Sequence, residues 1–200
     1  DRFTGDYTLG GYSKHLVVRE EFALRMPDGL DLAKAAPLLC AGITTYSPLR
    51  TWNVGPGSRV GVIGLGGLGH MAVKLAVGMG AHVTVLSRTA DKAEDAKALG
   101  ANALLVSSDE EAMKKAASSF DLIIDTVSAE HDYNAYLNLL RPRGAMVVVG
   151  VPPKPSPVAA FSLIGGNRRL AGSSIGNMKQ TQEVLDFCAK HQFGADVEVI

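Results

Sequence analysis

The chain has 200 residues, of which 46% are hydrophobic, and 20 Lys and Arg residues balance 20 Asp and Glu residues. This composition allows a sizeable buried core, and the net charge of zero leaves no basic surface for nucleic acid or for a membrane. The two cysteines, Cys40 and Cys188, are too few and too far apart for a disulfide framework, which favours a reducing, cytoplasmic location. No apolar segment approaches the length of a membrane span, and no signal-peptide pattern opens the chain. Because the sequence begins at Asp1 without Met and ends within an apolar stretch at Ile200, we expect a piece of a longer protein.

The first 30 residues are rich in glycine and predict short strands. Residues 12–18 alternate and then become apolar, and residues 22–27 form a second strand-like stretch that ends at a Pro-Asp-Gly turn. Because this part has no core of its own, it predicts the end of a β-domain. A helical pattern follows from Asp31, its expected N-cap, and Pro37 should break this pattern into two pieces.

Further along the chain, short apolar strands alternate with amphipathic helices. Strands this apolar are buried on both faces, so the alternation predicts a parallel sheet covered by helices on both sides. With a glycine-rich turn after its first strand, the pattern predicts an α/β Rossmann fold, a doubly wound sheet in the order 3-2-1-4-5-6. The expected strands are 59–63, 82–86, 103–106, 121–125, 145–149 and 169–173, with a further strand from residue 197. The expected helices are 67–79, 90–99, 109–118, 131–140, 160–165 and a last one, and Ser108 with Glu111 and Asn177 with Gln180 are expected cap pairs.

The first strand runs directly into Gly64-Leu65-Gly66-Gly67-Leu68-Gly69, a G-x-G-x-x-G sequence that opens a helix. In a dinucleotide site, Gly64 permits the tight turn, Gly66 lets the backbone approach a pyrophosphate, and Gly69 lets the helix pack closely on the strand. The free N–H groups and the positive dipole end of the helix then face the phosphates. The motif alone also fits an ordinary turn, but strand, turn and helix in this order favour a dinucleotide.

The end of the second strand indicates which dinucleotide binds. An NAD site needs an Asp or Glu there to bind both ribose hydroxyls, but this chain has Ser87. Together with Arg88 and Lys92, the Ser87 hydroxyl suits the 2′-phosphate of NADP(H). The alternative is that Arg88 and Lys92 are ordinary solvated residues, although cations at a helix N-terminus oppose the helix dipole when no anion accompanies them. We therefore predict NADP(H) rather than NAD(H).

Six stretches along the chain carry a resemblance to a known family. They are Gly10-Gly11-Tyr12-Ser13, Ala36-Pro37-Leu38-Leu39-Cys40-Ala41-Gly42-Ile43-Thr44-Thr45-Tyr46, Gly64 to His70, Ile124-Asp125-Thr126-Val127-Ser128, Ala171 to Gly176 and Ala195-Asp196-Val197-Glu198. Together they resemble the zinc-dependent medium-chain alcohol dehydrogenases, and specifically the cinnamyl-alcohol-dehydrogenase-like branch. The resemblance covers essentially all 200 residues, and the motifs taken jointly are specific to this branch.

The resemblance implies a fold in which a split GroES-like β-domain is joined to a Rossmann domain. Residues 1–50 would then be the last part of the GroES-like catalytic domain with its linking helices, residues 51–190 the NADP-binding domain, and residues 191–200 the start of the return. The family reaction is the reversible oxidation of a primary alcohol to an aldehyde, and an aromatic, cinnamyl-type or medium-chain substrate is implied. A catalytic zinc polarises the alcohol or aldehyde oxygen, and hydride passes between substrate and nicotinamide.

The resemblance also implies the residues of the site. Cys40 would be one of three ligands of the catalytic zinc, whereas the sequence alone would favour a buried helix cysteine. The implied cofactor-binding residues are Thr44 near the nicotinamide, Gly64, Leu65, Gly66, Gly67, Leu68 and Gly69 at the pyrophosphate, Ser87, Arg88, Thr89 and Lys92 at the 2′-phosphate, Thr126 and Gly150 at strand ends, and Ser173, Ser174 and Ile175 at the nicotinamide amide. Ser174 and Ile175 would also face the substrate, and the alternative for the two serines is a simple loop before a helix.

Several features of the family are absent from this sequence: its first zinc Cys, its Gly-His-Glu segment, its proton relay and its four-cysteine structural zinc loop. We therefore assign the chemistry to a full-length parent and expect the 200-residue chain to be inactive and at best to bind the cofactor. The five histidines show no ligand spacing, and His70 should only pack at the start of its helix. The alternatives are a non-catalytic NADPH-binding module or a zinc-free quinone reductase of the same superfamily. In this family the edge strand pairs with its copy in a second subunit, so we expect a homodimer through residues 161–175.

Overall fold

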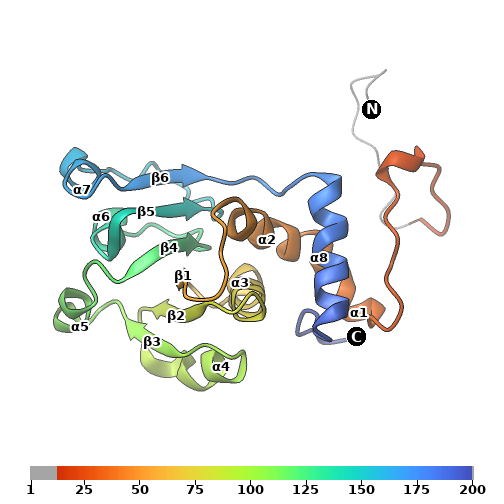
Figure 1. Cartoon of the computed structure of the whole chain (residues 1–200), viewed down its shortest axis with the longest axis horizontal. Coiled ribbons are helices and arrows are strands. Elements are labelled where there is room, and N and C mark those ends of the chain that lie inside the picture. Colours follow the sequence, from red (N-terminus) through yellow and green to blue (C-terminus); the bar gives the residue numbers. More distant parts are fainter. Residues whose placement is uncertain (1–12, 200) are drawn as a thin grey trace.

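The computed structural model describes residues 13–199, in which six strands form one sheet (Figure 1). The strand order is β3-β2-β1-β4-β5-β6 and every neighbouring pair is parallel, so the predicted doubly wound sheet is confirmed. Its strands are β1 (Arg59–Ile63), β2 (His82–Ser87), β3 (Ala103–Val106), β4 (Phe120–Asp125), β5 (Leu140–Val148) and β6 (Arg169–Gly172). The expectations for Gly10, Gly11, Tyr12 and Ile200 lie outside the described residues.

Helices cover both faces of the sheet, because alternate strand residues point to opposite sides. One core cluster joins Val60 and Val62 of β1 with buried residues of α2, α3 and α8. A second cluster joins Ile63 with buried residues of α6 and with partly buried residues of α5 and α7. Within the described part of the chain, no helix is both long and apolar enough to cross a membrane. The helices are α1 (Leu32–Ala35), α2 (Ala41–Thr51), α3 (Gly67–Gly78), α4 (Ala93–Ala98), α5 (Glu110–Lys115), α6 (Tyr133–Leu137), α7 (Ala160–Ile164) and α8 (Met178–Lys190), with 3₁₀ helices at Glu20–Phe22, Ala36–Leu39 and Ala90–Lys92.

Several predicted helix ends are confirmed. The side chain of Asp31 accepts hydrogen bonds from the backbone N–H groups of Ala33 and Lys34, which caps α1. The helical stretch that follows breaks at Pro37, because α1 gives way there to a 3₁₀ turn before α2 begins. Asn177 and Gln180 form the expected capping box of α8.

Two expectations near β3 and β4 are wrong. Ser108 does not cap α5: its hydroxyl donates to the carbonyl of Arg88 at 2.8 Å, and Asp109 accepts from the first turn of the helix instead. The helix expected over 131–140 is shorter, because the chain joins the sheet at Leu140, where it pairs with Phe120. The register then shifts along β4 and β5, an irregularity that apolar periodicity does not reveal.

The strands expected at 12–18 and 22–27 do not form over the described residues, and neither does the one from residue 197. A lone strand has unpaired N–H and C=O groups and needs a neighbour, and no described strand lies beside these segments. Val17 is 98% exposed and Val199 is 81% exposed, whereas Leu24 and Met26 of the middle segment pack against the core without forming a strand.

The chain arrives at the Rossmann core and departs from it at one place, near α1 and the end of α8 (Figure 1). The backbone N–H of Ala195 donates to the carbonyl of Lys34 at 3.0 Å. The next residue, Asp196, accepts from the Lys74 ammonium of α3 at 2.7 Å. Residues 31–50 share the core of α3 and α8, and the domain boundaries at residues 50 and 190 stay predictions.

Candidate cofactor-binding site

The glycine turn joins β1 to α3 in a conformation that needs glycine at two positions. Gly64 has φ of 86°, and a Cβ there would lie 2.8 Å from a methyl group of Val127. A Cβ on Gly69 would lie only 2.2 Å from the carbonyl oxygen of Gly64, so the first turn of α3 packs directly on the loop. These two glycines therefore have the turn and close-packing roles that the motif predicts.

The other two glycines of the turn face open space. A Cβ at Gly66 or Gly67 would meet no atom within 4 Å, and both residues are exposed. No side chain of the described residues caps α3 at Gly66, so the N–H groups of its first turn are not used by a local acceptor. This surface suits an anion such as a pyrophosphate, and contact of Gly64, Leu65, Gly66, Gly67, Leu68 and Gly69 with a cofactor stays a prediction.

A pocket of about 330 Å³ adjoins this turn at the end of β2. It brings Ser87, Arg88, Thr89 and Lys92 together with Gly64, as expected for residues that surround one part of a ligand. Arg88 is exposed and its backbone is held by Ser108, whereas Lys92 forms an exposed ion pair with Asp95 at 3.1 Å. Arg88 is therefore a cation at the pocket with no ion-pair partner among the described residues. Lys92 is a second cation, and it would have to leave its ion pair with Asp95 to bind an anion in the pocket.

The opposite wall of this pocket was not predicted from the sequence. It consists of Val127, Ala129, Glu130, His131 and Tyr136. His131 contacts the fully buried carboxylate of Asp125 at the end of β4, with 3.1 Å between Nε2 and Oδ2. Burial raises the pKa of Asp125, and the neighbouring His131 and the Val127 N–H oppose that rise. His131 follows Asp125 by six positions in the sequence, and the only signal was the polar Asp125 at the end of an apolar strand.

Thr126 and Gly150 lie side by side at the ends of β4 and β5, as the fold requires. The hydroxyl of Thr126 donates to the carbonyl of Ile63 at 2.7 Å, so this side chain ties β4 to β1. Gly150 is buried, and a Cβ there would lie 2.4 Å from the Val127 carbonyl oxygen. Both residues shape the floor between the strand ends, and neither lines the pocket beside Ser87.

The remaining predicted residues form a separate group on α2 and on the loop after β6. Thr44 is 9% exposed in α2, whereas Ser174 and Ile175 are exposed. The two segments meet, because a Cβ at Gly176 would lie 2.6 Å from the Cδ1 of Ile43. Ser173 is held by its N–H, which donates to the carbonyl of Val148 at 3.1 Å. The structure thus places α2, the helix that carries Thr44, against Gly176 at the end of this loop, and Thr44 does not line the pocket beside β2.

Cys40 lies at the start of α2 and is exposed, so the interpretation as a buried helix cysteine is wrong. Over residues 13–199, no three His, Cys, Asp or Glu side chains lie close enough together to hold a metal ion. A catalytic zinc needs three protein ligands. The described residues therefore do not form a zinc site, and they present Cys40 as a single accessible sulfur donor.

A thiol reagent should modify one cysteine of the native chain and both cysteines of the unfolded chain. Cys188 is fully buried in α8, and burial raises its pKa to about 12, so it stays protonated and unreactive. Because the folded chain holds this proton more tightly than the unfolded chain, the free energy of unfolding does not depend on Cys188 ionisation below the unfolded pKa of 9.0. It falls as the pH rises from 9.0 toward the folded pKa of about 12. Absorbance of the released chromophore with and without guanidinium measures both counts, and a Cys40→Ser variant should show no native reaction. Two reactive thiols in the native chain would contradict the buried position of Cys188.

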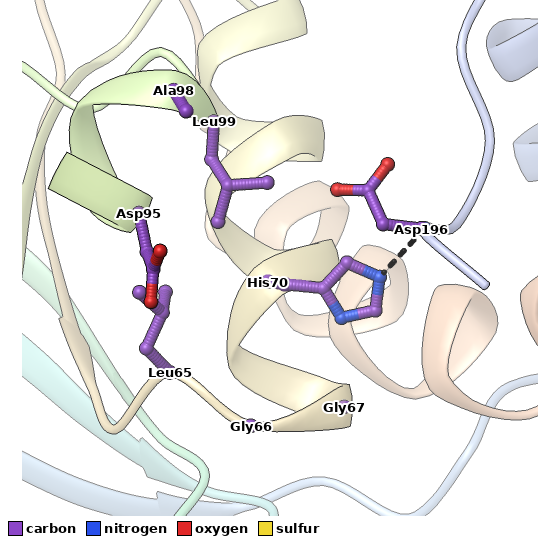
Figure 2. A pocket seen from close by; sticks show the side chains of 8 residues that line it. All are labelled: Leu65, Gly66, Gly67, His70, Asp95, Ala98, Leu99 and Asp196. Carbon is purple, nitrogen blue, oxygen red and sulfur yellow. Dashed lines mark hydrogen bonds between the residues drawn. The ribbon is translucent and has the colours of Figure 1, made fainter. Parts of the chain in front are cut away.

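A second pocket, of about 420 Å³, lies behind the glycine turn (Figure 2). Its lining comes from the glycine turn and the start of α3, with Leu65, Gly66 and His70, and from Asp95 in α4 and Leu99 just after that helix. His70 does more than pack at the start of α3, since its Nε2 accepts from the backbone N–H of Asp196 at 3.3 Å. This pocket is thus closed on one side by the chain segment that follows α8.

The sequence and the fold match known proteins. The model of the family described as zinc-binding dehydrogenase matches residues 67–190. An NADP-dependent alcohol dehydrogenase C 1 from Mycolicibacterium smegmatis is 58% identical over 196 residues, which cover 98% of this chain and 56% of that protein. A cinnamyl alcohol dehydrogenase from Sorghum bicolor has a TM-score of 0.89 with 49% identity, over 92% of this chain and 52% of that one. The cinnamyl alcohol dehydrogenase from Helicobacter pylori, complexed with NADP(H), has a TM-score of 0.80 with 43% identity, over 88% and 50%.

The chain spans about half the length of the curated relatives it matches. The family model covers more than half of the chain, including the glycine turn from Gly67 onward, all of β2 to β6 and α8. The chain belongs to the zinc-binding dehydrogenase family, as its resemblance to the medium-chain alcohol dehydrogenases predicted.

Proposed function

We propose that this chain is the cofactor-binding part of an NADP(H)-dependent alcohol dehydrogenase that interconverts primary alcohols and aldehydes. The carrying observation is the pocket at the end of β2, where Ser87 stands in place of the acid that NAD needs and Arg88 stands beside it. The glycine turn supplies a surface for the pyrophosphate next to the same pocket. An NADP-dependent relative and an NADP(H)-bound structure of a relative support this choice of cofactor.

The roles of the chain's own residues follow from their positions. The open side of Gly66 and Gly67 would hold the pyrophosphate, and Ser87, Arg88 and Lys92 would bind the 2′-phosphate. Thr44 and the loop at 173–175 would orient the nicotinamide end, with Ser174 and Ile175 toward the substrate. When bound, nicotinamide exchanges hydride with the substrate carbon and zinc polarises the substrate oxygen. Cys40 would hold that zinc with ligands outside this sequence, and the substrate class is an aromatic, cinnamyl-type or medium-chain alcohol or aldehyde.

A fluorescence titration with NADPH and NADH tests the proposed cofactor. We expect NADPH to bind at least about tenfold more tightly, because even one charge-assisted contact to the phosphate contributes about 1.5 kcal/mol or more. Equal affinities for the two cofactors would contradict the proposal. For the 200-residue chain alone we expect no turnover and no stoichiometric zinc, since the described residues offer one ligand of three.

The exposed Cys40 favours the zinc enzyme over the two alternatives, a non-catalytic NADPH-binding module and a zinc-free quinone reductase. Neither of these proteins needs an accessible sulfur donor beside Thr44. Tight stoichiometric zinc binding by a longer version of the protein, lost on Cys40→Ser, separates the proposals. A longer protein that binds NADPH but turns over alcohols equally well with Cys40→Ser would favour the zinc-free alternatives.

We also propose that the chain forms a homodimer through the free edge of β6, over residues 161–175. Among the described strands, β6 pairs only with β5, so its other edge has no neighbouring strand. In the neighbouring helix α7, Phe161 is 77% exposed and Ile164 is 68% exposed. An edge strand beside exposed apolar side chains is stabilised when a second copy covers it. Light scattering at micromolar concentration should give the mass of a dimer, and Phe161→Glu should shift it toward a monomer. A monomeric wild-type chain would refute this assembly.

A further inference from the structure

The carboxylate of Asp125 is fully buried at the end of β4, next to the pocket proposed for the cofactor. Its Oδ1 accepts from the Val127 N–H at 3.1 Å, and its Oδ2 lies 3.1 Å from Nε2 of His131. Its backbone carbonyl accepts from the N–H groups of Val149 and Gly150. Burial of an isolated carboxylate is costly, so a group this enclosed needs a proton or a positive partner. His131 is the partner that the structure supplies.

The ring of His131 lies between two oxygens that can accept hydrogen bonds. Its Nδ1 is 2.8 Å from the carbonyl oxygen of Ala129, and since a carbonyl only accepts, Nδ1 carries a hydrogen. The contact between Nε2 and the Asp125 carboxyl then needs one further proton, because otherwise a lone pair would face a carboxylate. Whichever atom holds that proton, the Asp125–His131 pair as a whole has no net charge.

The position of His131 makes this neutrality important for the pocket. Its side chain is 14% exposed, and its ring packs against Tyr133 and Tyr136 with centroid distances of 5.0 and 5.7 Å. With Tyr136 it lines the pocket across from Ser87 and Arg88.

The other charged groups at this pocket belong to exposed side chains. Glu130 is paired with Lys154 at 2.9 Å, and Lys92 with Asp95 at 3.1 Å. Arg88, the remaining cation that lines the pocket, is exposed and forms no hydrogen bond with Asp125. Loss of the proton shared by Asp125 and His131 would therefore add a buried negative charge with no hydrogen-bonded cation beside it.

We propose that His131 is a specificity-determining positioning residue: it neutralises Asp125 and so lets the pocket accept the 2′-phosphate of the cofactor. The same two hydrogen bonds fix residues 127–131 as the wall opposite Ser87 and Arg88. This inference rests on the proposed NADP(H) function and assigns a role there to two residues outside the glycine turn and the β2 end. It predicts that the effect of His131 depends on whether the cofactor carries a phosphate.

The test compares dissociation constants for NADPH and NADH in three chains. His131→Phe keeps a ring against Tyr133 and Tyr136 but leaves Asp125 without a proton donor. Without His131 the buried carboxyl stays neutral only by taking a proton from solvent, so the titrations are run at alkaline pH, where that proton is lost. There we expect the Kd for NADPH to rise at least about tenfold more than the Kd for NADH, because the uncompensated charge repels the phosphate. Adding Asp125→Asn removes the carboxylate, so the double variant should regain most of the lost discrimination.

The outcomes separate this inference from a purely structural role and from the proposed function. If His131 only supports the loop, both Kd values rise together and Asp125→Asn does not restore the ratio, which would overturn the inference. If the wild-type chain binds NADPH no more tightly than NADH, the proposed function itself fails. Circular dichroism checks folding, and if His131→Phe does not fold, His131→Gln with and without Asp125→Asn gives the same two opposed outcomes.

Discussion

Replacing Arg88 with Asp is expected to weaken NADPH binding about 100-fold, since a charge-assisted bond worth about 1.5–3 kcal/mol becomes a repulsion. Arg88 is exposed at the end of β2, and its backbone is fixed by the Ser108 hydroxyl, so the substitution changes charge at a defined place. The Kd for NADH should change by no more than about threefold, because NADH has no 2′-phosphate. Fluorescence titration of both cofactors measures the two effects.

The matched control for this substitution is Lys97→Asp. Lys97 is an exposed residue of α4 that does not line the pocket, and the change in charge is the same. NADPH binding by Lys97→Asp should stay near the wild-type value. If Arg88→Asp and Lys97→Asp behave alike, the β2 end does not read the phosphate and the NADP(H) assignment loses its structural basis.

Replacing Gly69 with Ala is expected to lower the free energy of unfolding by about 3 kcal/mol or to prevent folding. The added Cβ would lie 2.2 Å from the Gly64 carbonyl oxygen, and a backbone atom in a tight turn cannot move aside as a flexible side chain can. Relief would require α3 to shift away from β1. Urea unfolding followed by circular dichroism gives the change in stability.

Gly67→Ala, in the same loop and helix, should behave in the opposite way. A Cβ at Gly67 meets no atom within 4 Å, and Ala is up to about 1 kcal/mol better than Gly in a helix, so stability should hold or rise. Cofactor binding should nevertheless weaken, because the methyl group occupies space proposed for the pyrophosphate. Equal stabilities for Gly69→Ala and Gly67→Ala would refute the packing role of Gly69, and unchanged NADPH affinity in Gly67→Ala would place the pyrophosphate elsewhere.

The sequence predicted the sheet well because its strands are buried on both faces. A continuous apolar stretch such as 145–149 fits a buried strand better than most other structures, and the glycine turn indicates which strand is central. The same reasoning failed over residues 13–18, the described part of the strand expected at 12–18, because no described strand lies beside them. Local pattern can identify a segment able to form a strand, whereas pairing depends on what lies next to it in space.

The candidate site likewise contains residues that the sequence could predict and a contact that it could not. Ser87, Arg88 and Gly69 could be proposed from the sequence because their expected roles depend on a fixed distance from a strand end. The contact between Asp125 and His131 could not, because it arises only when the loop after β4 folds back on the strand. Lone histidines carry no signal in a sequence until the acceptors on both sides of the ring are known.

The contact between Lys34 and Ala195 has a mechanical consequence. A Cβ on the neighbouring Gly194 would lie 2.7 Å from the Cβ of Lys34, and the Ala195 N–H is bound to the Lys34 carbonyl, so the incoming and outgoing segments cannot slide past each other. Two segments bound to each other at one point share a pivot. Movement of residues 13–24 and 197–199 against the Rossmann core should therefore pivot at this contact. The contacts of Asp196 with His70 and Lys74 place that pivot beside α3, whose first turn begins at the glycine loop.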